Sequence, residues 1–313
     1  MPLALYEFLP RGRMTMGWNA VGGISLHSAL RLGRISNLPT VWTNVIAGIV
    51  LSGAAVSARP SLLLMLSLSL FYIAGMFLND AFDREFDRRD RPQRPIPAGE
   101  VAAATVFACG FSLLGAGFAF LVAVVYATAG GGCWRALAAG ALLAGMIILY
   151  DAWHKSNPVG PLVMGLCRFL VYVVAGLSVA GTIPSGLLLA AIVCLFYLIG
   201  LTYVAKQESL RRISNFWPLL FLAAPFVYGA PLAAKGGGAL VHYLLLLAAV
   251  GMALILIFRP SGPDIPHAIM LLIAGICLLD GMFVAGQGQT LLAAAAVAAF
   301  LLTLGLQRFV PGT

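Results

Sequence analysis

Residues 77–100 read "FLNDAFDREFDRRDRPQRPIPAGE", a charged stretch that lies between two long apolar runs. Only 10% of the chain is charged, yet this stretch holds six of its eleven acidic residues and five of its nineteen basic residues. The flanking runs are long enough to be membrane-spanning helices, so the stretch is predicted to join two of them where water meets lipid. Ionisable groups at such a boundary are costly and usually functional.

The rest of the chain has the composition of an integral membrane protein. Of its 313 residues, 61% are hydrophobic, more than one soluble domain could bury. Apolar windows of about 20 residues recur along nearly the whole length. They fall at 38–57, 61–79, 101–126, 134–151, 160–180, 186–205, 215–233, 239–258, 265–284 and 289–309. Ten crossings are expected, or nine if the three prolines in 215–233 break that segment.

Unbroken apolar runs with scattered Gly and Ala predict an all-α fold, a polytopic bundle of nine to ten transmembrane helices. A membrane barrel would show short alternating strands instead. Residues 1–37 precede the first window and are predicted to form a cytoplasmic N-terminal segment. Residues 38–313 are predicted to form a single transmembrane domain.

The net charge of +8 is informative by its location. Fifteen of the nineteen Lys and Arg residues lie near the termini or in the loops after the second, fourth, sixth and eighth windows. By the positive-inside rule, both termini and these loops, including 77–100, are expected to face the cytoplasm. The basic residues therefore indicate the orientation of the chain in the lipid bilayer, which is its expected partner, and no nucleic acid is expected.

Asn79, Asp80, Asp83 and Asp87 form the pattern N-D-x-x-D-x-x-x-D. At about 100° per residue, the three aspartates fall on one face of a helix. Such close carboxylates repel unless a cation lies among them, and Mg²⁺ prefers a few carboxylates together with phosphate oxygens. A solvated loop, in which Asp and Arg pair at i,i+3 and i,i+4, is the alternative.

The same pattern, followed by "RPQRPIPAG", resembles the first aspartate-rich motif of the UbiA superfamily of membrane prenyltransferases. The resemblance implies a helical bundle that moves an isoprenyl group from a Mg²⁺-bound prenyl diphosphate to a lipophilic or aromatic acceptor. Under this hypothesis the three aspartates are catalytic metal ligands. Asn79, Arg88 and Arg94 would bind the diphosphate.

Two further stretches resemble the same superfamily. In "RISNLPTVWTNVIAG", Asn44 matches a polar position that faces the diphosphate. In "YDAWHKSNPVGPLVMGLCR", Tyr150 and Lys155 match a Tyr-x-x-x-Lys element, with one extra residue between them. Lys155 is expected to take part in catalysis and Tyr150 in substrate binding. Arg168 is a further candidate partner of the diphosphate, or else forms an intramembrane pair with a carboxylate or with backbone carbonyls.

The second aspartate-rich motif of the superfamily is degenerate in "LTYVAKQESLRRISNFWP", residues 201–218. Glu208 is the one carboxylate that remains at the three acidic positions, and we expect it to be a catalytic metal ligand. Lys206, Arg211 and Arg212 would supply positive charge for the substrate in place of a second metal. The alternative is that Glu208 and Arg212 form an ordinary helical pair and the site is degraded.

The chain is most similar to the UbiA-like EboC group in "YDAWHK", "MGLCR" and "TYVAKQES". The predicted function is Mg²⁺-dependent prenyl transfer in the bacterial cytoplasmic (inner) membrane. The alternative is a non-catalytic or transport protein that binds a prenyl diphosphate or an amphiphilic metabolite. Asp280, an isolated acid in an apolar window, is expected to serve helix packing or to pair with a basic residue.

Overall fold

A computed structural model describes residues 23–128, 134–155, 157–207, 215–260 and 262–312. All the regular elements in these ranges are helices, which confirms the predicted all-α class. They are α1 (Leu26–Leu32), η1 (Ile35–Asn37), α2 (Leu38–Leu51), α3 (Ala58–Phe82), α4 (Arg84–Asp90), α5 (Ala103–Thr128), α6 (Trp134–Trp153), α7 (Gly160–Ala180), α8 (Ser185–Lys206), η2 (Trp217–Ala223), α9 (Ala224–Ala233), α10 (Gly237–Ile257), α11 (Ile265–Gly286) and α12 (Thr290–Gln307).

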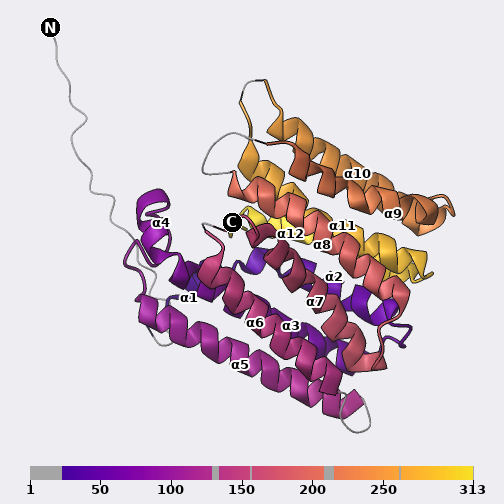
Figure 1. The fold of residues 1–313 in the computed structure, drawn as a ribbon, viewed down its shortest axis with the longest axis horizontal. Coiled ribbons are helices and arrows are strands. Elements are labelled where there is room, and N and C mark those ends of the chain that lie inside the picture. Colours follow the sequence, from indigo (N-terminus) through magenta and orange to yellow (C-terminus); the bar gives the residue numbers. More distant parts are fainter. Residues whose placement is uncertain (1–22, 129–133, 156, 208–214, 261, 313) are drawn as a thin grey trace, which may run out of the picture.

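Eight of these helices are long and apolar enough to cross a membrane. They are α3, α5, α6, α7, α8, α10, α11 and α12, and they coincide with eight of the ten predicted windows. The chain is therefore a multi-pass membrane bundle. Figure 1 shows the long helices side by side, with α5 along one edge and α9 and α10 along the other.

The other two predicted windows are shorter than expected. The first, 38–57, is helical only to Leu51, because the chain turns at Ser52 and Gly53, and Gly53 adopts a φ of 78° that favours glycine. The seventh, 215–233, is divided into the 3₁₀ helix η2 and the short helix α9. Prolines at both helix starts and inside α9 account for this division, as the sequence predicted.

The centre of the bundle is formed by α11, most of whose residues are buried, together with α2, α7 and α8. A glycine allows α2 to lie close to α7: a Cβ added to Gly48 would lie 2.8 Å from Ala175 Cβ. Such close approach through small residues is typical of membrane helices. It also brings the polar groups of α2 against α7 and α11, while α3 and α6 carry the charged end of the bundle.

Candidate functional site

The motif Asn79–Asp87 lies at the break between α3 and α4. Asn79 and Asp80 belong to the last turn of α3, Asp83 lies between the two helices, and Asp87 belongs to α4. All four residues are at least nine-tenths buried. Buried carboxylates need charged or hydrogen-bonding partners, so the solvated-loop alternative does not describe these four residues.

Two arginines neutralise Asp80 and Asp87. Arg94 Nη1 lies 3.1 Å from Asp80 Oδ1 and 2.7 Å from Asp87 Oδ2. Arg34 Nη2 donates to the same Asp80 oxygen at 3.0 Å and to Asn79 Oδ1 at 3.3 Å. Arg34 comes from the turn between α1 and η1, where its φ of 43° makes it the one non-glycine residue with positive φ in the described ranges. Arg34 therefore has a left-handed backbone conformation, uncommon for a residue other than glycine, in the turn from which its guanidinium contacts Asp80.

Asp83 faces a second set of basic groups, from the end of α6. Lys155 Nζ lies 2.9 Å from Asp83 Oδ2, and His154 Nε2 lies 3.5 Å from the same oxygen. His154 is fixed by a 3.0 Å contact between its Nδ1 and the Tyr150 carbonyl, and its ring stacks on that of Tyr150 with centroids 4.5 Å apart. Lys155 also lies 4.1 Å from the centroid of the Phe86 ring, a cation–π contact.

Two carboxyl groups of the motif, Asp83 and Asp87, lie outside the spans, and their pKa values are shifted in opposite directions. Burial raises the pKa of Asp83, but the hydrogen bonds and charges of His154 and Lys155 outweigh burial and leave it below its ordinary value. Burial also raises the pKa of Asp87, and there the guanidinium of Arg94 does not offset it, so the pKa stays above its ordinary value. Burial and the nearby carboxylates of Asp80 and Asp83 therefore disfavour the charged form of Asp87 more than Arg94 stabilises it.

Two buried carboxylate oxygens in this cluster have no hydrogen-bond partner within the described part of the chain. They are Asp87 Oδ1 and Asp151 Oδ2. The other oxygen of Asp151 accepts from Asn79 Nδ2 at 3.3 Å, which places this α6 carboxylate next to the motif. Unpartnered buried carboxylate oxygens are suited to a hard cation, since Mg²⁺ and Ca²⁺ take oxygen ligands.

The donor set therefore fits Mg²⁺ by its chemistry. In this structure, however, the motif aspartates are paired with basic side chains. No three His, Cys, Asp or Glu side chains of the described residues converge tightly enough to hold an ion.

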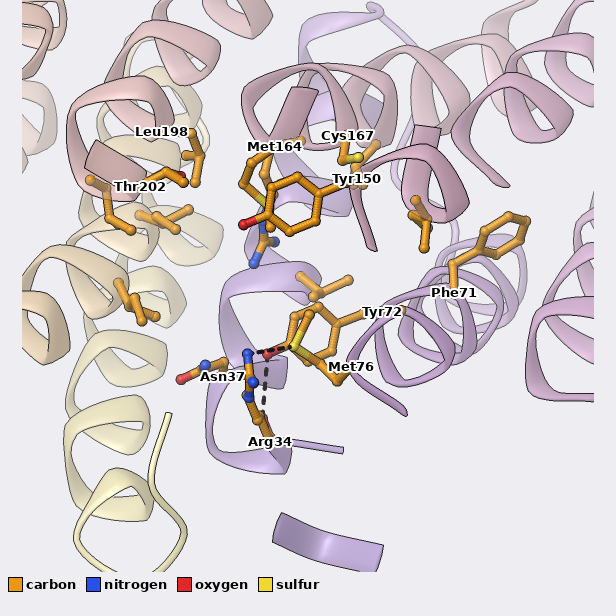
Figure 2. Close-up of a pocket in the computed structure, with 18 of the residues that line it drawn as sticks. Arg34, Asn37, Phe71, Tyr72, Met76, Tyr150, Met164, Cys167, Leu198 and Thr202 are labelled. Carbon is orange, nitrogen blue, oxygen red and sulfur yellow. Dashed lines mark hydrogen bonds between the residues drawn. The ribbon is translucent and has the colours of Figure 1, made fainter. Parts of the chain in front are cut away.

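An apolar cavity of about 200 Å³ opens beside the cluster. Helices α2, α3, α6, α7, α8 and α11 line it, mostly with aliphatic and aromatic side chains. Figure 2 shows Tyr150 and Tyr72 pointing toward the same space, with Arg34 beside Tyr72. Arg34 and Asp151 line the cavity as well as belonging to the cluster, so the charged site and the apolar space are continuous.

Asn44 and Arg168 lie in a second polar group, inside the bundle. Arg168 Nη1 donates to Asn44 Oδ1 at 2.7 Å, and its Nη2 donates to Thr40 Oγ1 at 2.9 Å. Asn44 Nδ2 donates in turn to Asp280 Oδ2 at 2.7 Å. Arg168 lines the cavity, whereas Asn44 is fully buried. Asp280 forms no direct pair with a basic residue among the described contacts; Thr43, Asn44 and Tyr172 donate to it, and Asn44 lies between Asp280 and Arg168.

The remaining predicted site residues divide into three groups. Arg88 pairs with Glu85 at 2.9 Å and its side chain is 68% exposed, so it lies apart from the buried cluster. Lys206, at the end of α8, donates to the Asn157 carbonyl at 2.7 Å, and a Cβ added to Gly160 would lie 3.1 Å from its Nζ. Glu208, Arg211 and Arg212 lie outside the described residues.

The site residues predicted from the sequence include neither Arg34 nor Asp151, although Asp151 follows the predicted site residue Tyr150 and could help it to orient an acceptor or to take up a proton. Arg34 falls in the segment predicted to precede the membrane domain, where a basic residue is expected for topology alone. Asp151 is the next residue after Tyr150 in "YDAWHK", and an acid so near the end of an apolar run was the available signal. Both reach the motif through tertiary packing that spacing along the chain does not reveal.

Comparisons with known proteins identify similar chains. Residues 40–264 match the model of the UbiA prenyltransferase family. A digeranylgeranylglyceryl phosphate synthase from Methanopyrus kandleri is 25% identical over 275 residues, which cover 84% of this chain and 93% of that protein. One from Methanoculleus marisnigri is 32% identical over 96 residues, which cover 31% of this chain and 34% of that protein, so the match spans about a third of its length.

The fold is also found among solved structures. An apo structure of a UbiA homologue from Aeropyrum pernix K1 aligns with a TM-score of 0.61 at 16% identity. The alignment covers 80% of this chain and 97% of that one. At this identity the likeness shows a shared helical fold.

Proposed function

Because the chain belongs to the UbiA prenyltransferase family, we propose that it is a Mg²⁺-dependent prenyltransferase of the membrane interior. It would move an isoprenyl group from a prenyl diphosphate to a lipophilic or aromatic acceptor. The observation that carries this proposal is that the buried motif Asn79–Asp87 contacts Arg34 and Asp151, two residues that also line an apolar cavity. The charged cluster would bind the diphosphate group of the substrate, and the apolar cavity would bind its isoprenyl chain.

The residues proposed to hold Mg²⁺ are Asp80, Asp83 and Asp87, with Asn79 beside them. Bound there, the metal would neutralise charge on the diphosphate as the carbon–oxygen bond breaks. The unpartnered Oδ1 of Asp87 supports this assignment, because a buried carboxylate oxygen needs a cation or a donor. Glu208 remains a proposed ligand on the strength of the family resemblance.

Basic side chains of the cluster are proposed to bind the diphosphate oxygens. Arg34, Arg94 and Lys155 each contact a motif aspartate and lie within reach of whatever those aspartates hold. Guanidinium groups suit this role because they donate in pairs to phosphate oxygens. Arg88, Lys206, Arg211 and Arg212 remain proposed contributors from the sequence.

The cavity is proposed to hold the prenyl chain and to keep water from the reacting carbon. Its walls are mostly apolar, and an allylic cation formed there would be shielded from hydrolysis. Tyr150 projects into this space and is proposed to contact the acceptor. The acceptor is proposed to be lipophilic, since the cavity is bounded by membrane helices.

The same surroundings support a second candidate function, a protein that binds or transports a prenyl diphosphate without reaction. The observation that favours it is the degenerate stretch at 201–218, where Glu208 is the one carboxylate left at the family's acidic positions. For location, we propose the bacterial cytoplasmic membrane, with both termini and the Asp-rich stretch on the cytoplasmic side. This proposal rests on the distribution of Lys and Arg among the loops.

The decisive experiment incubates the detergent-purified protein with labelled prenyl diphosphates and extracted cell lipids, with MgCl₂ or with excess EDTA. Product is expected in the samples with MgCl₂ and not in those with EDTA. The mass of the product would identify the prenyl group and the acceptor. Asp83→Asn should abolish product, whereas Glu85→Gln, an exposed acid on the neighbouring α4, should not. Turnover that survives complete chelation would refute the metal role. Binding without product, across several acceptors, would favour the second candidate function.

A further inference from the structure

A buried hydrogen-bond network joins α2, α7 and α11 beneath the charged cluster. Its centre is the carboxylate of Asp280, which is 1% exposed. Oδ1 accepts a short hydrogen bond from the Tyr172 hydroxyl. Oδ2 accepts from Thr43 Oγ1 at 2.5 Å and from Asn44 Nδ2 at 2.7 Å. The proposed chemistry does not use this carboxylate, although a buried acid in a membrane bundle is costly to keep.

The two oxygens of Asp280 serve different neighbours. Oδ2 faces α2, and through it the carboxylate determines which way the amide of Asn44 is turned. Because the Asn44 NH₂ group donates to Asp280, the Asn44 carbonyl oxygen is directed to Arg168, from which it accepts at 2.7 Å. The opposite amide orientation would place an NH₂ group against the guanidinium, where two donors would meet.

Arg168 is the member of this network that reaches the cavity. It lines the cavity together with Arg34 and is held by Asn44 on one Nη and by Thr40 on the other. The guanidinium also lies 5.7 Å from the centroid of the Tyr72 ring. A guanidinium held at two points loses less freedom when it binds an anion, so the network prepares Arg168 for a ligand in the cavity.

We propose that Asp280 is a positioning residue: through Asn44 it orients Arg168 to bind the diphosphate of a prenyl diphosphate substrate. This inference rests on the proposed function, since it assumes that a prenyl diphosphate enters the cavity. Asp280 itself touches no substrate. Its effect passes through the Oδ2 side of the carboxylate and not through Tyr172.

The test measures the dissociation constant of geranyl diphosphate for detergent-purified protein in MgCl₂ buffer, alongside thermal stability. Asp280→Leu should weaken binding by about tenfold or more, because Asn44 loses the acceptor that orients it. Asp280→Asn should bind within about threefold of wild type. Its carbonyl oxygen can replace Oδ2, while its NH₂ group donates to the Tyr172 hydroxyl.

The matched control is Tyr172→Phe, which removes a hydrogen bond to the same carboxylate on the Oδ1 side. It should lower thermal stability and leave the affinity for geranyl diphosphate near that of wild type. A merely structural role for Asp280 predicts that Asp280→Leu and Tyr172→Phe behave alike. Asn44→Ala gives a second route to the same test, because it breaks the link to Arg168 and leaves Asp280 bonded to Thr43 and Tyr172.

A double-mutant cycle completes the experiment. If Asp280 acts through Arg168, Asp280→Leu should cause no further loss of affinity in an Arg168→Ala background. Additive effects, or unchanged affinity in Asp280→Leu and Asn44→Ala, would overturn the inference. Wild-type protein that fails to bind geranyl diphosphate would refute the proposed function as well. Wild-type binding with unchanged variants would overturn the positioning role alone.

Discussion

Replacing Arg94 with alanine is a sharp test of the charged cluster, because this one guanidinium serves two buried carboxylates. Arg94 is 11% exposed, and its Nη1 lies 3.1 Å from Asp80 and 2.7 Å from Asp87. Asp80 would keep Arg34 at 3.0 Å. Asp87 is 1% exposed and its Oδ1 is already unpartnered within the described part of the chain, and it would lose the guanidinium that now lies 2.7 Å from its Oδ2. The variant therefore isolates one buried carboxylate.

The size of the effect follows from that burial. Removing one partner of a buried ion pair costs about 3–5 kcal/mol, because the remaining charge is left uncompensated. Arg88→Ala is the matched control: it removes an arginine from the same stretch whose pair with Glu85 is 68% and 66% exposed. Exposed pairs contribute about 0–1 kcal/mol. Arg94→Ala should therefore be destabilised by several kcal/mol and Arg88→Ala hardly at all.

The assay is thermal unfolding of both variants in the same detergent, with EDTA and with MgCl₂. On the scale of soluble domains, about 2 °C per kcal/mol, Arg94→Ala should melt at least roughly 6 °C below wild type in EDTA. Adding MgCl₂ should raise the melting temperature of Arg94→Ala by more than it raises that of wild type. The reason is that a bound cation would replace the missing guanidinium charge. Equal melting temperatures for Arg94→Ala and Arg88→Ala would refute the reasoning.

Three further changes test other parts of the molecule. Gly48→Val should lower thermal stability markedly, because an added Cβ would already lie 2.8 Å from Ala175 Cβ; a melting temperature like that of wild type would show that α2 and α7 are not packed so closely. Lys155→Ala should weaken prenyl diphosphate binding several-fold and lower the melting temperature less than Arg94→Ala does, since Lys155 is 36% exposed and His154 stays 3.5 Å from Asp83; unchanged affinity would remove Lys155 from the site. Asp264→Ala should cost about 1 kcal/mol by removing the N-cap of α11 at neutral pH. Because the pKa of Asp264 is lowered in the folded state, the wild-type advantage is present above the ordinary Asp pKa and should disappear as the pH falls through the folded value; melting curves across this range that keep a constant gap would contradict it.

The spans were predictable from sequence because membrane helices are defined by length and hydropathy, which are local properties. The aspartate motif was predictable for a similar reason, since its four polar residues lie within nine positions. The early end of α2 was not predicted. The predicted window continued past Leu51 to residue 57, but the chain turns at Gly53. Three inferences stay predictions: the resemblance to the EboC group, the boundary between an N-terminal segment and a membrane domain at residue 38, and the roles of the site residues.

The partners of the buried charges were not predictable in the same way. Asp80 pairs with Arg34 across 46 positions of sequence, and Asn44 bonds to Asp280 across 236. A spacing rule can place carboxylates on one helix face, but the cations opposite that face come from segments between helices that only the folded chain brings together: Arg34 precedes η1, Arg94 follows α4 and Lys155 follows α6. Alternation of Asp and Arg within residues 77–100 suggested local pairs, and that pattern holds for the exposed pair of Arg88 and Glu85. Burial separates the two cases, and burial is set by tertiary packing.

The pairing within the cluster also bears on how a metal diphosphate would bind. Each motif aspartate is matched here by a basic side chain: Asp80 and Asp87 by Arg94, and Asp83 by Lys155. A cation alone would meet these basic groups, and a diphosphate alone would meet the carboxylates, so each by itself faces a like charge. Together they allow an exchange of partners, in which the aspartates turn to the metal and the freed basic groups turn to the phosphate oxygens. The arrangement therefore favours joint binding of metal and diphosphate, and such coupling is reciprocal: each ligand raises the affinity for the other by the same factor.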